Sequence, residues 1–332
     1  MKKLFIGLLV SIVFIYFSFR GVDFGKALEG LRNVQYVFLV PAVVLLLLIS
    51  WLRSLRWGVI LSATEQIPQR KLFPITCVGF MAIALFPMRI GELARPYLVS
   101  REGGISFSPA LATIFIERVI DSLSLLVILL LVMVNAPLPA WMTKTGYGLL
   151  AAFSFVLLFV CLLYFSKGLP LKLLGPFLRR LPPSLRERAE HMVGSFADGF
   201  AVMGKPGHMG YIFLLSLLIW GASGIIIYSL FFFLNLALPV TSAFVVLIVT
   251  IAGISLPTAP GLIGNFQFAC IVGLSLFGVP KDNALAFSMV YYLIGIGIQI
   301  VLGLLFLPSL RISFRELGKM GFTTRHSGQK SG

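Results

Sequence analysis

Long apolar runs separated by short polar segments recur along the whole chain of 332 residues. A helix that crosses the roughly 30 Å hydrocarbon core of a bilayer needs about 20 predominantly apolar residues, and six runs approach that length. They are residues 4–19, 36–51, 119–134, 147–165, 211–234 and 284–306. The pattern therefore predicts an all-α, polytopic membrane protein with about six full transmembrane helices.

Two further apolar stretches are interrupted, and they predict re-entrant or broken helical hairpins. The apolar run 73–86 is too short for a comfortable crossing and is followed directly by a proline. The run 240–256 is likewise followed by a proline-rich break and a second short apolar run. Proline interrupts the hydrogen-bond ladder of a helix. We therefore expect the regions 73–118 and 240–280 each to enter and leave the membrane on one side.

The two broken regions share a layout that indicates an internal repeat. Pro87-Met88-Arg89-Ile90-Gly91-Glu92 and Pro260-Gly261-Leu262-Ile263-Gly264-Asn265 both read as a proline, three residues, a glycine and a polar residue. An Ala-Leu-Ala triplet follows each proline at nearly the same distance, as Ala110-Leu111-Ala112 and Ala284-Leu285-Ala286. The predicted topology gives the two units opposite orientations. Inverted repeats with interrupted helices are a recurring plan of secondary transporters, whose binding site lies near the membrane midplane.

Composition supports the membrane class and excludes an ordinary soluble enzyme. Hydrophobic residues make up 58% of the chain and charged residues only 12%, with a mean hydropathy of +1.00, whereas soluble domains carry about 25% charged residues. The formal net charge is +15. The basic residues stand between the apolar runs, as positive-inside topology and attraction to anionic lipid require. We therefore expect no nucleic-acid partner.

The distribution of lysine and arginine predicts the orientation of the chain. The connection 166–208 carries seven, the tail 311–332 five and the stretch 53–71 four, and the loops on the other side carry fewer. Both termini should therefore face the cytoplasm, with the protein in the cell (plasma or inner) membrane. The run 4–19 lacks a cleavage-site pattern, so we interpret it as a retained first helix rather than a signal peptide.

This topology divides the chain into four parts. Residues 1–165 hold the first transmembrane repeat plus the first span of the second, and residues 209–310 hold the remainder of the bundle. Residues 166–208 form a basic cytoplasmic connection whose apolar residues recur at helical spacing, which predicts an amphipathic interfacial helix. Residues 311–332 form a basic cytoplasmic tail.

Six charged residues in two short segments are the strongest candidates for function. A single charge at the centre of a bilayer costs about 2.5–3.5 kcal/mol on insertion scales, so intramembrane charges pair with one another or line a wet cavity. We interpret the arginines as ligands of an anionic lipid headgroup, since the guanidinium fork suits phosphate, and the acids as the groups that hold them. The alternative is that all six lie at headgroup level and anchor helix ends. They are Arg89, Glu92, Arg95, Glu117, Arg118 and Asp121.

Two of these acids pose a specific electrostatic problem. Glu117 and Asp121 are four residues apart and share a face of the predicted helix, where like charges repel. The repulsion is avoided only where a cation lies between them.

The second hairpin offers a different kind of candidate site. Helix-breaking residues expose backbone amides there, and a half-helix starting at this point would direct its positive end toward the midplane, where it suits a phosphate oxygen. The alternative is a proline kink with glycines for close packing. The residues are Pro257, Pro260, Gly261, Gly264 and Asn265.

Signatures of catalysis are missing from the sequence. No G-x-S-x-G, HExxH or P-loop motif occurs, and the three histidines (His191, His208 and His326) are far apart in polar segments. We therefore expect no catalytic residues, no metal site and no cofactor, and the chain is predicted not to be an enzyme.

The motifs resemble a known family. Phe86-Pro87-x-Arg89-x-Gly91-Glu92-x-x-Arg95, followed by Glu117-Arg118-x-x-Asp121 and Pro257-x-x-Pro260-Gly261-x-x-Gly264, resemble the transmembrane flippase domain of lysylphosphatidylglycerol synthases and its stand-alone relatives, over about residues 4–310. The resemblance implies that a lipid moves between leaflets, in the best-known members an aminoacylated phosphatidylglycerol. Only the short tail 311–332 follows the matching region, so the aminoacyl-transferase activity of the bifunctional members is not expected.

Three hypotheses follow for the function. The first is a lipid flippase or transporter for an anionic or aminoacylated phospholipid, or a lipid-linked phosphate, with membrane phospholipids as its partners. The second is a membrane enzyme acting on a lipid-linked phosphate, with Glu117 or Asp121 as acid or base. The third is a non-transporting scaffold whose partner is a lipid-modifying enzyme. The identity of the lipid, the energy source and the oligomeric state stay open at this level.

Overall fold

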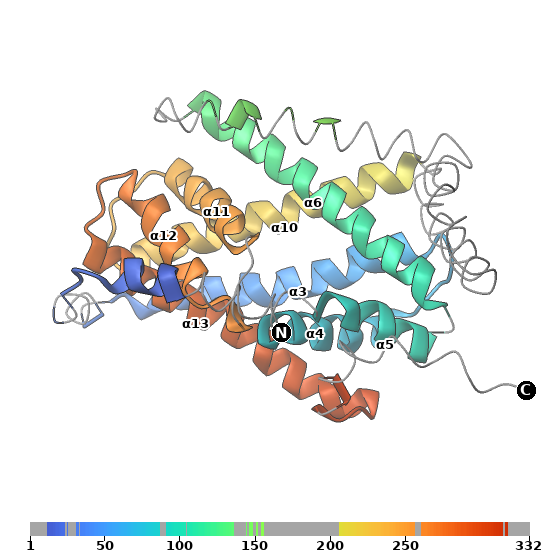
Figure 1. Cartoon of the computed structure of the whole chain (residues 1–332). Helices are drawn as coiled ribbons and strands as arrows, with labels where there is room; N and C mark the ends of the chain where they lie inside the picture. Colours follow the sequence, from blue (N-terminus) through green and yellow to red (C-terminus); the bar gives the residue numbers. More distant parts are fainter. Residues whose placement is uncertain are drawn as a thin grey trace, which may run out of the picture.

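Helices make up the part of the chain that the computed structural model describes, and no strand occurs in it (Figure 1). The description covers residues 12–23, 25, 31–32, 34–86, 91–103, 105–135, 144, 146–148, 151, 154–155, 206–255, 260–314 and 316–317. The main helices are α3 (Leu39–Leu61), α4 (Gln69–Leu85), α5 (Ala94–Gly103), α6 (Phe107–Asn135), α10 (Pro206–Phe233), α11 (Val240–Ser255), α12 (Asn265–Ser275) and α13 (Lys281–Phe306). Short 3-10 turns are η1 (Tyr36–Phe38), η4 (Pro260–Leu262) and η5 (Leu307–Leu310).

Several predicted features fall outside these residues. Most of the runs 4–19 and 147–165 do so, as does the amphipathic segment within 166–208. Among the candidate site residues, Arg89 and Pro257 also lie outside the described residues. The division into four parts therefore stays a prediction.

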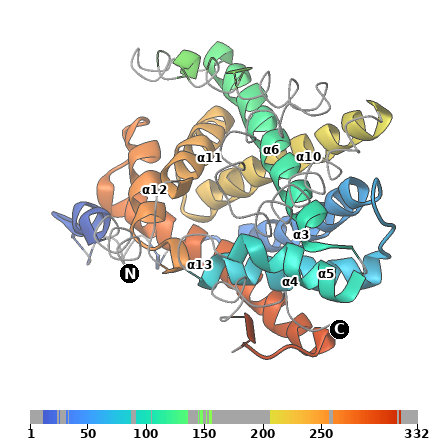
Figure 2. The ribbon, with the colours of Figure 1, turned by 45° about the vertical axis from the view of Figure 1, so that its right-hand side comes forward.

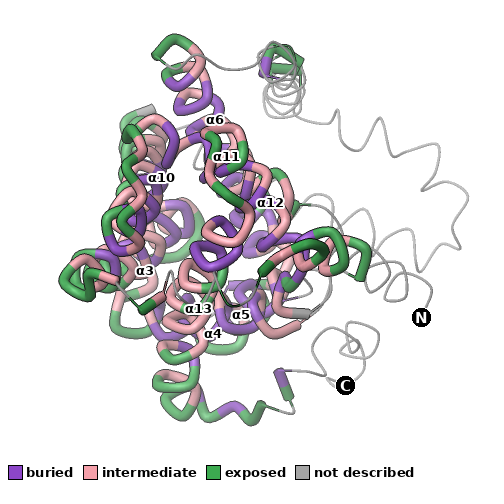
Figure 3. The backbone as a smooth tube through the Cα atoms, turned by 90° about the vertical axis from the view of Figure 1, so that its left-hand side faces the viewer, coloured by how far each residue is buried: buried purple, intermediate pink, exposed green. Residues whose placement is uncertain are grey.

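The described helices fit a membrane environment. The segments Tyr36–Leu61, Gly207–Phe233 and Lys281–Leu310 are long and apolar enough to cross a bilayer. Their outer faces carry exposed apolar side chains, such as Leu293 at 72% and Leu305 at 68% exposure, and Figure 3 shows the exposed stretches on the periphery. Such faces suit contact with hydrocarbon rather than water. The chain is thus a polytopic helical membrane protein.

The helices pack in an order that matches between the two halves. α3 packs along α10, and each continues into a helix, a break, a short helix and a long helix. α13 packs along α4 of the first half, and correspondingly α6 contacts α11 of the second. The hairpins α4–α5 and α11–α12 lie at different ends of the assembly (Figures 1 and 2). An internal repeat would produce this pairing; the repeat and the inversion of its two units stay predictions.

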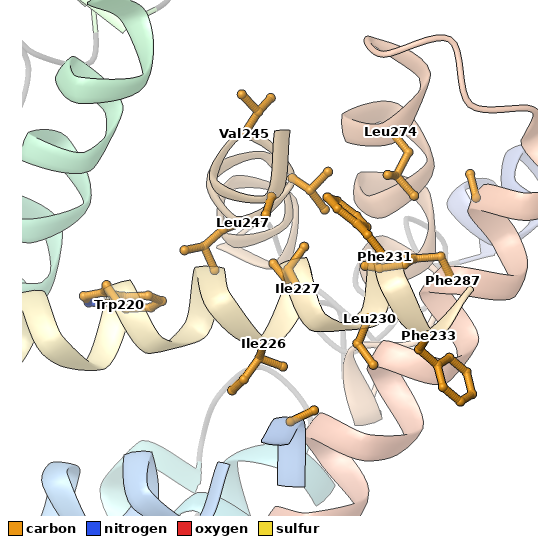
Figure 4. Close-up of a cluster of buried hydrophobic side chains, with 14 of the residues drawn as sticks. Trp220, Ile226, Ile227, Leu230, Phe231, Phe233, Val245, Leu247, Leu274 and Phe287 are labelled. Carbon is orange, nitrogen blue, oxygen red and sulfur yellow. The ribbon is translucent and has the colours of Figure 1, made fainter. Parts of the chain in front are cut away.

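Three hydrophobic clusters are found among the described residues. One joins α10, α11, α12 and α13 around Phe231, Leu247, Leu274 and Phe287 (Figure 4). A second joins α3, α4 and α5 and includes Trp57, and a smaller third joins α3, α6 and α10. The polar residues described below come from α3, α5, α6 and α10.

Two helices extend beyond their predicted limits. α3 continues to Leu61, well past the predicted end at Trp51, and α6 begins at Phe107, well before the predicted start at Val119. The prediction that Arg53 and Arg56 belong to a basic stretch after the second span is therefore wrong. Both are inside α3, where ion pairs with Glu117 and Asp121 compensate the charge of Arg56, and Arg53 stacks on Phe80. Neither arginine counts toward the predicted orientation of the chain, which rests on the remaining basic segments.

Candidate functional site

Charged and polar side chains from four helices converge at one place. α6 contributes Glu117, Arg118 and Asp121, which its periodicity places on neighbouring positions of one face. Arg56 comes from α3, and Arg95 comes from α5. Since opposite charges from separate helices meet here, the cluster fixes the mutual positions of those helices.

Glu117 is the centre of this cluster. Its side chain is fully buried, and both carboxylate oxygens receive hydrogen bonds from Arg95, at 3.0 and 2.9 Å. Arg118 donates to Glu117 Oε1 at 3.0 Å, and Arg56 Nη2 lies 3.1 Å from the same oxygen. Three guanidinium groups thus surround one buried carboxylate, which removes the penalty of an unpaired charge.

Arg56 is a buried cation between Glu117 and Asp121. In addition to its contact with Glu117, it forms a short ion pair with Asp121 Oδ1, and its Nη2 donates to Oδ2 at 3.3 Å. It also donates to Ser216 Oγ of α10 at 2.6 Å. The half-exposed Arg118 of α6 contacts both acids as well, so the repulsion between them is offset from their own helix and from α3.

Arg95 is held rigidly behind the cluster. Its side chain is 1% exposed, and its guanidinium carbon lies 4.2 Å from the ring centroid of Trp57. A Cβ added at Gly79 of α4 would overlap the Arg95 side chain. Trp57 in turn donates from Nε1 to Thr113 Oγ1 at 3.0 Å. Packing and hydrogen bonding therefore direct both terminal nitrogens of Arg95 at Glu117.

A cavity of about 270 Å³ lies in front of the cluster. Arg53, Glu92, Arg118 and Asp121 form its charged wall. The lining that comes from α11, α12, α13 and the second break carries no charge and is largely apolar, including Ile251, Ile254, Leu262, Phe266 and Ile296. A chamber lined by both ionic and apolar groups suits an amphipathic ligand.

The second hairpin supplies part of this cavity through its break. Gly261 and Gly264 have φ angles of +78° and +90°, and Leu262 between them has +60°, a left-handed backbone that favours glycine. Tyr292 of α13 donates its hydroxyl to the carbonyl of Gly261 at 2.6 Å. The break is thereby tied to α13 at the cavity wall.

The amides at the start of α12 have partners of their own. Gly264 N–H donates to Gln267 Oε1 at 2.8 Å. Asn265 is 1% exposed, and its Nδ2 donates to the carbonyl of Gly253 at 3.4 Å. Pro260 begins η4, just before these residues. The geometry thus shows a capped and closely packed helix start, and phosphate binding there stays a prediction.

The sequence-predicted residues occupy two distinct positions. Glu92, Arg118 and Asp121 line the cavity, whereas Arg95 and Glu117 form a buried pair behind it. Sequence reasoning missed Arg53 and Arg56 as site residues. The available signal was their spacing of three residues within an otherwise apolar helix, which puts both on one face.

The described residues contain no group of three or more His, Cys, Asp or Glu side chains that could hold a metal ion. The acids of the cluster are each contacted by arginine instead. The arrangement can bind a charged group at the pre-formed ionic lining of the cavity while an apolar portion of the same ligand contacts the apolar lining residues.

Comparisons with known proteins show similarity over nearly the whole chain. Residues 4–303 match a family model described as the lysylphosphatidylglycerol synthase TM region. Two UPF0104 membrane proteins of Methanothermobacter thermautotrophicus are 26% and 24% identical, covering 88% and 85% of this chain and 91% and 86% of their own lengths. A UPF0104 membrane protein of Methanocaldococcus jannaschii is 26% identical over 64% of this chain and 86% of its own length.

Proposed function

The chain belongs to the family of the lysylphosphatidylglycerol synthase transmembrane region, and from that premise we propose that it is a lipid flippase. Its substrate is a phospholipid with an anionic or aminoacylated headgroup, or a lipid-linked phosphate, which it moves between the leaflets of the cell membrane. Both termini face the cytoplasm in this proposal.

The observation that carries the proposal is a cavity that combines charged and apolar lining residues. A phospholipid crossing the bilayer needs a polar surface for its headgroup and an apolar surface for its acyl chains. The cavity offers Glu92, Arg118 and Asp121 from the first half of the chain and Ile254 and Phe266 from the second. A charge exposed to hydrocarbon is costly, so a lined cavity of this kind lowers the barrier that the headgroup meets.

The contacts of the charged residues support a division of roles. Arg56 and Arg95 are buried and each is paired with the buried Glu117, so these three residues hold the charged lining in position. Arg118 has a side chain that is 36% exposed, so it contacts the headgroup. Alternating movement of the two hairpins opens the cavity to each leaflet in turn.

The same ion pairs favour transport over an enzymatic role, and the proposal includes no covalent step. An acid–base catalyst must be free to exchange a proton with its substrate. Glu117 and Asp121 are instead engaged by guanidinium groups.

Arg118→Ala tests the proposal directly. Purified protein is reconstituted into vesicles that carry fluorescent phosphatidylglycerol in both leaflets, and loss of signal on adding a membrane-impermeant quencher reports translocation. The wild type should bleach nearly all the probe, and Arg118→Ala only the outer half. Arg101→Ala, which removes an arginine whose side chain is 40% exposed, is the matched control and should behave as the wild type.

Two outcomes would contradict the proposal. Transport by the wild type no faster than in protein-free vesicles would exclude a flippase and favour the scaffold hypothesis. Transport by Arg118→Ala at the wild-type rate would remove this arginine from the mechanism.

A further inference from the structure

Arg53 differs from the other described arginines near the cavity in what it contacts. Arg56, Arg95 and Arg118 each form ion pairs with Glu117, Asp121 or both. The ion pairs and hydrogen bonds found among the described residues include none for Arg53. Its guanidinium carbon instead lies 4.6 Å from the ring centroid of Phe80. Both side chains line the cavity.

The position of Arg53 makes it a candidate ligand for an anion. It lies in the second half of α3, more than two helical turns from either end of that helix. At this depth water solvates a charge poorly, so the negative charge of a ligand stabilises Arg53 by a larger free energy than it would at the protein surface. Four described arginines (Arg53, Arg56, Arg95 and Arg118) stand against three acids (Glu92, Glu117 and Asp121), so the site carries one excess positive charge. Of the four, Arg53 is the arginine for which the described residues provide no ion pair.

Phe80 defines how Arg53 presents its donors. The phenyl ring is shared by two arginines, with Arg95 at 5.1 Å and Arg53 at 4.6 Å from its centroid. Stacking on an aromatic face stabilises a guanidinium and leaves its edge, which carries the N–H donors, free to bind. Since Arg95 is fixed by Glu117, the ring between them is fixed as well, and Arg53 is pre-oriented.

We propose that Arg53, stacked on Phe80, binds the phosphodiester of the lipid headgroup, with Arg118 as the second donor on the same wall. This assignment rests on the proposed function and deepens it by naming the recognised group. The ligand is a glycerophospholipid with net negative charge, because the phosphate oxygens satisfy the fork of Arg53 in a bidentate way. Its acyl portion lies against Ile254, Leu262 and Phe266 of the apolar lining.

Binding in detergent tests the site apart from transport. Native mass spectrometry measures how much short-chain phosphatidylglycerol the purified protein retains, beside diacylglycerol of the same chain length, which lacks the phosphate. Arg53→Gln should weaken phosphatidylglycerol binding by about tenfold or more, as expected for a lost charge-assisted hydrogen bond, and leave diacylglycerol unchanged. Arg101→Gln, at the exposed surface, should bind both as the wild type does.

Two further variants keep the test decisive if Arg53→Gln fails to fold. Arg53→Lys keeps the charge but loses the planar fork, and should bind phosphatidylglycerol more weakly than the wild type. Phe80→Leu keeps Arg53 but removes the stacking surface, and should weaken binding in the same direction. Wild-type affinity for phosphatidylglycerol in the folded variants would overturn the assignment.

Competition with inorganic phosphate distinguishes a lipid headgroup from soluble phosphate as the anion that Arg53 binds. A lipid site should release phosphatidylglycerol only at phosphate concentrations far above that of the lipid, because the acyl contacts add to the affinity. Displacement by comparable concentrations would indicate a soluble phosphate and overturn the lipid assignment. If the wild-type protein binds phosphatidylglycerol in detergent but does not transport it in vesicles, the flippase proposal is contradicted and the Arg53 binding site is not.

Discussion

Trp220 of α10 donates its indole N–H to Oδ1 of Asp121 of α6 at 2.9 Å. Each residue is the fifteenth of its helix, in helices of 28 and 29 residues. The hydrogen bond therefore joins the two helices at their midpoints, and Figure 4 shows Trp220 on the side of α10 that faces α6. For helices that cross a bilayer, this contact places the charged cluster about halfway through.

Trp220→Phe tests the importance of this contact. The ring is largely retained, but Asp121 loses one of its donors, which should lower the free energy of unfolding by about 1–3 kcal/mol. Thermal stability of the detergent-purified protein, followed by size-exclusion chromatography after heating, measures the change. Trp51→Phe removes an exposed indole from α3 and should have no comparable effect. Equal stabilities of the two variants would show that the hydrogen bond contributes little.

Arg56→Met should destabilise the protein strongly. The substitution removes the buried cation between Glu117 and Asp121 and leaves only the half-exposed Arg118 in contact with both, and breaking a buried ion pair costs about 3–5 kcal/mol. The same heating assay measures it.

The double variant Arg56→Met/Asp121→Asn provides the control for that prediction. Removing one of the repelling charges should restore part of the stability, so the two substitutions should be less than additive. Strict additivity would mean that Arg56 does not act by separating the two acids.

Gly79→Ala should disturb the site without touching any charge. The added methyl group would overlap the Arg95 side chain and push it away from Glu117, at a cost of about 1–3 kcal/mol. Lipid translocation in vesicles should fall together with stability. Gly297→Ala on α13 meets nothing within 4 Å, so it should be neutral or slightly stabilising. A fully active and stable Gly79→Ala variant would contradict the close packing of Arg95.

Tyr292→Phe should affect transport more than folding. It removes one hydrogen bond, to the carbonyl of Gly261, worth about 0.5–1.5 kcal/mol, and frees the break that lines the cavity. A severalfold change in translocation rate with nearly unchanged thermal stability is the expected result. Tyr211→Phe, at an exposed position of α10, is the control. An unchanged rate in Tyr292→Phe would show that this tie has no part in the movement.

The helices of the described residues were largely predictable, and the errors have one cause. Apolar runs predicted α11 and α13 closely, with starts at Val240 and Lys281, since few polar residues interrupt them. In α3 and α6 the predicted limits were wrong because charged residues were taken as the ends of the membrane helices. Charged residues can lie inside such a helix when ion pairs from other helices offset the cost of burying them. Residues of those other helices are distant in sequence, so the sequence pattern does not reveal them.

The candidate site was likewise predicted only in part from the sequence. The spacing of Glu117 and Asp121 required a cation between them, but any of the arginines in the chain satisfied that requirement. Arg56 fills the role because α3 packs beside α6 and α10, which is a property of the assembled helices. The excess charge of Arg53 was equally hidden, since it emerges only after the other arginines are matched to their acids.

By itself the sequence determined that this protein is built of membrane helices, that two of its segments are broken, and that costly charges lie among apolar runs. These properties follow from composition and local spacing, because the bilayer imposes its length and polarity on each helix separately. Only the tertiary structure decided which charges neutralise one another and which face the cavity. The partners of a buried charge can be far away in the chain: Arg56 pairs with Asp121, 65 positions away, and donates a hydrogen bond to Ser216, 160 positions away. Helix packing sets the distances between such residues.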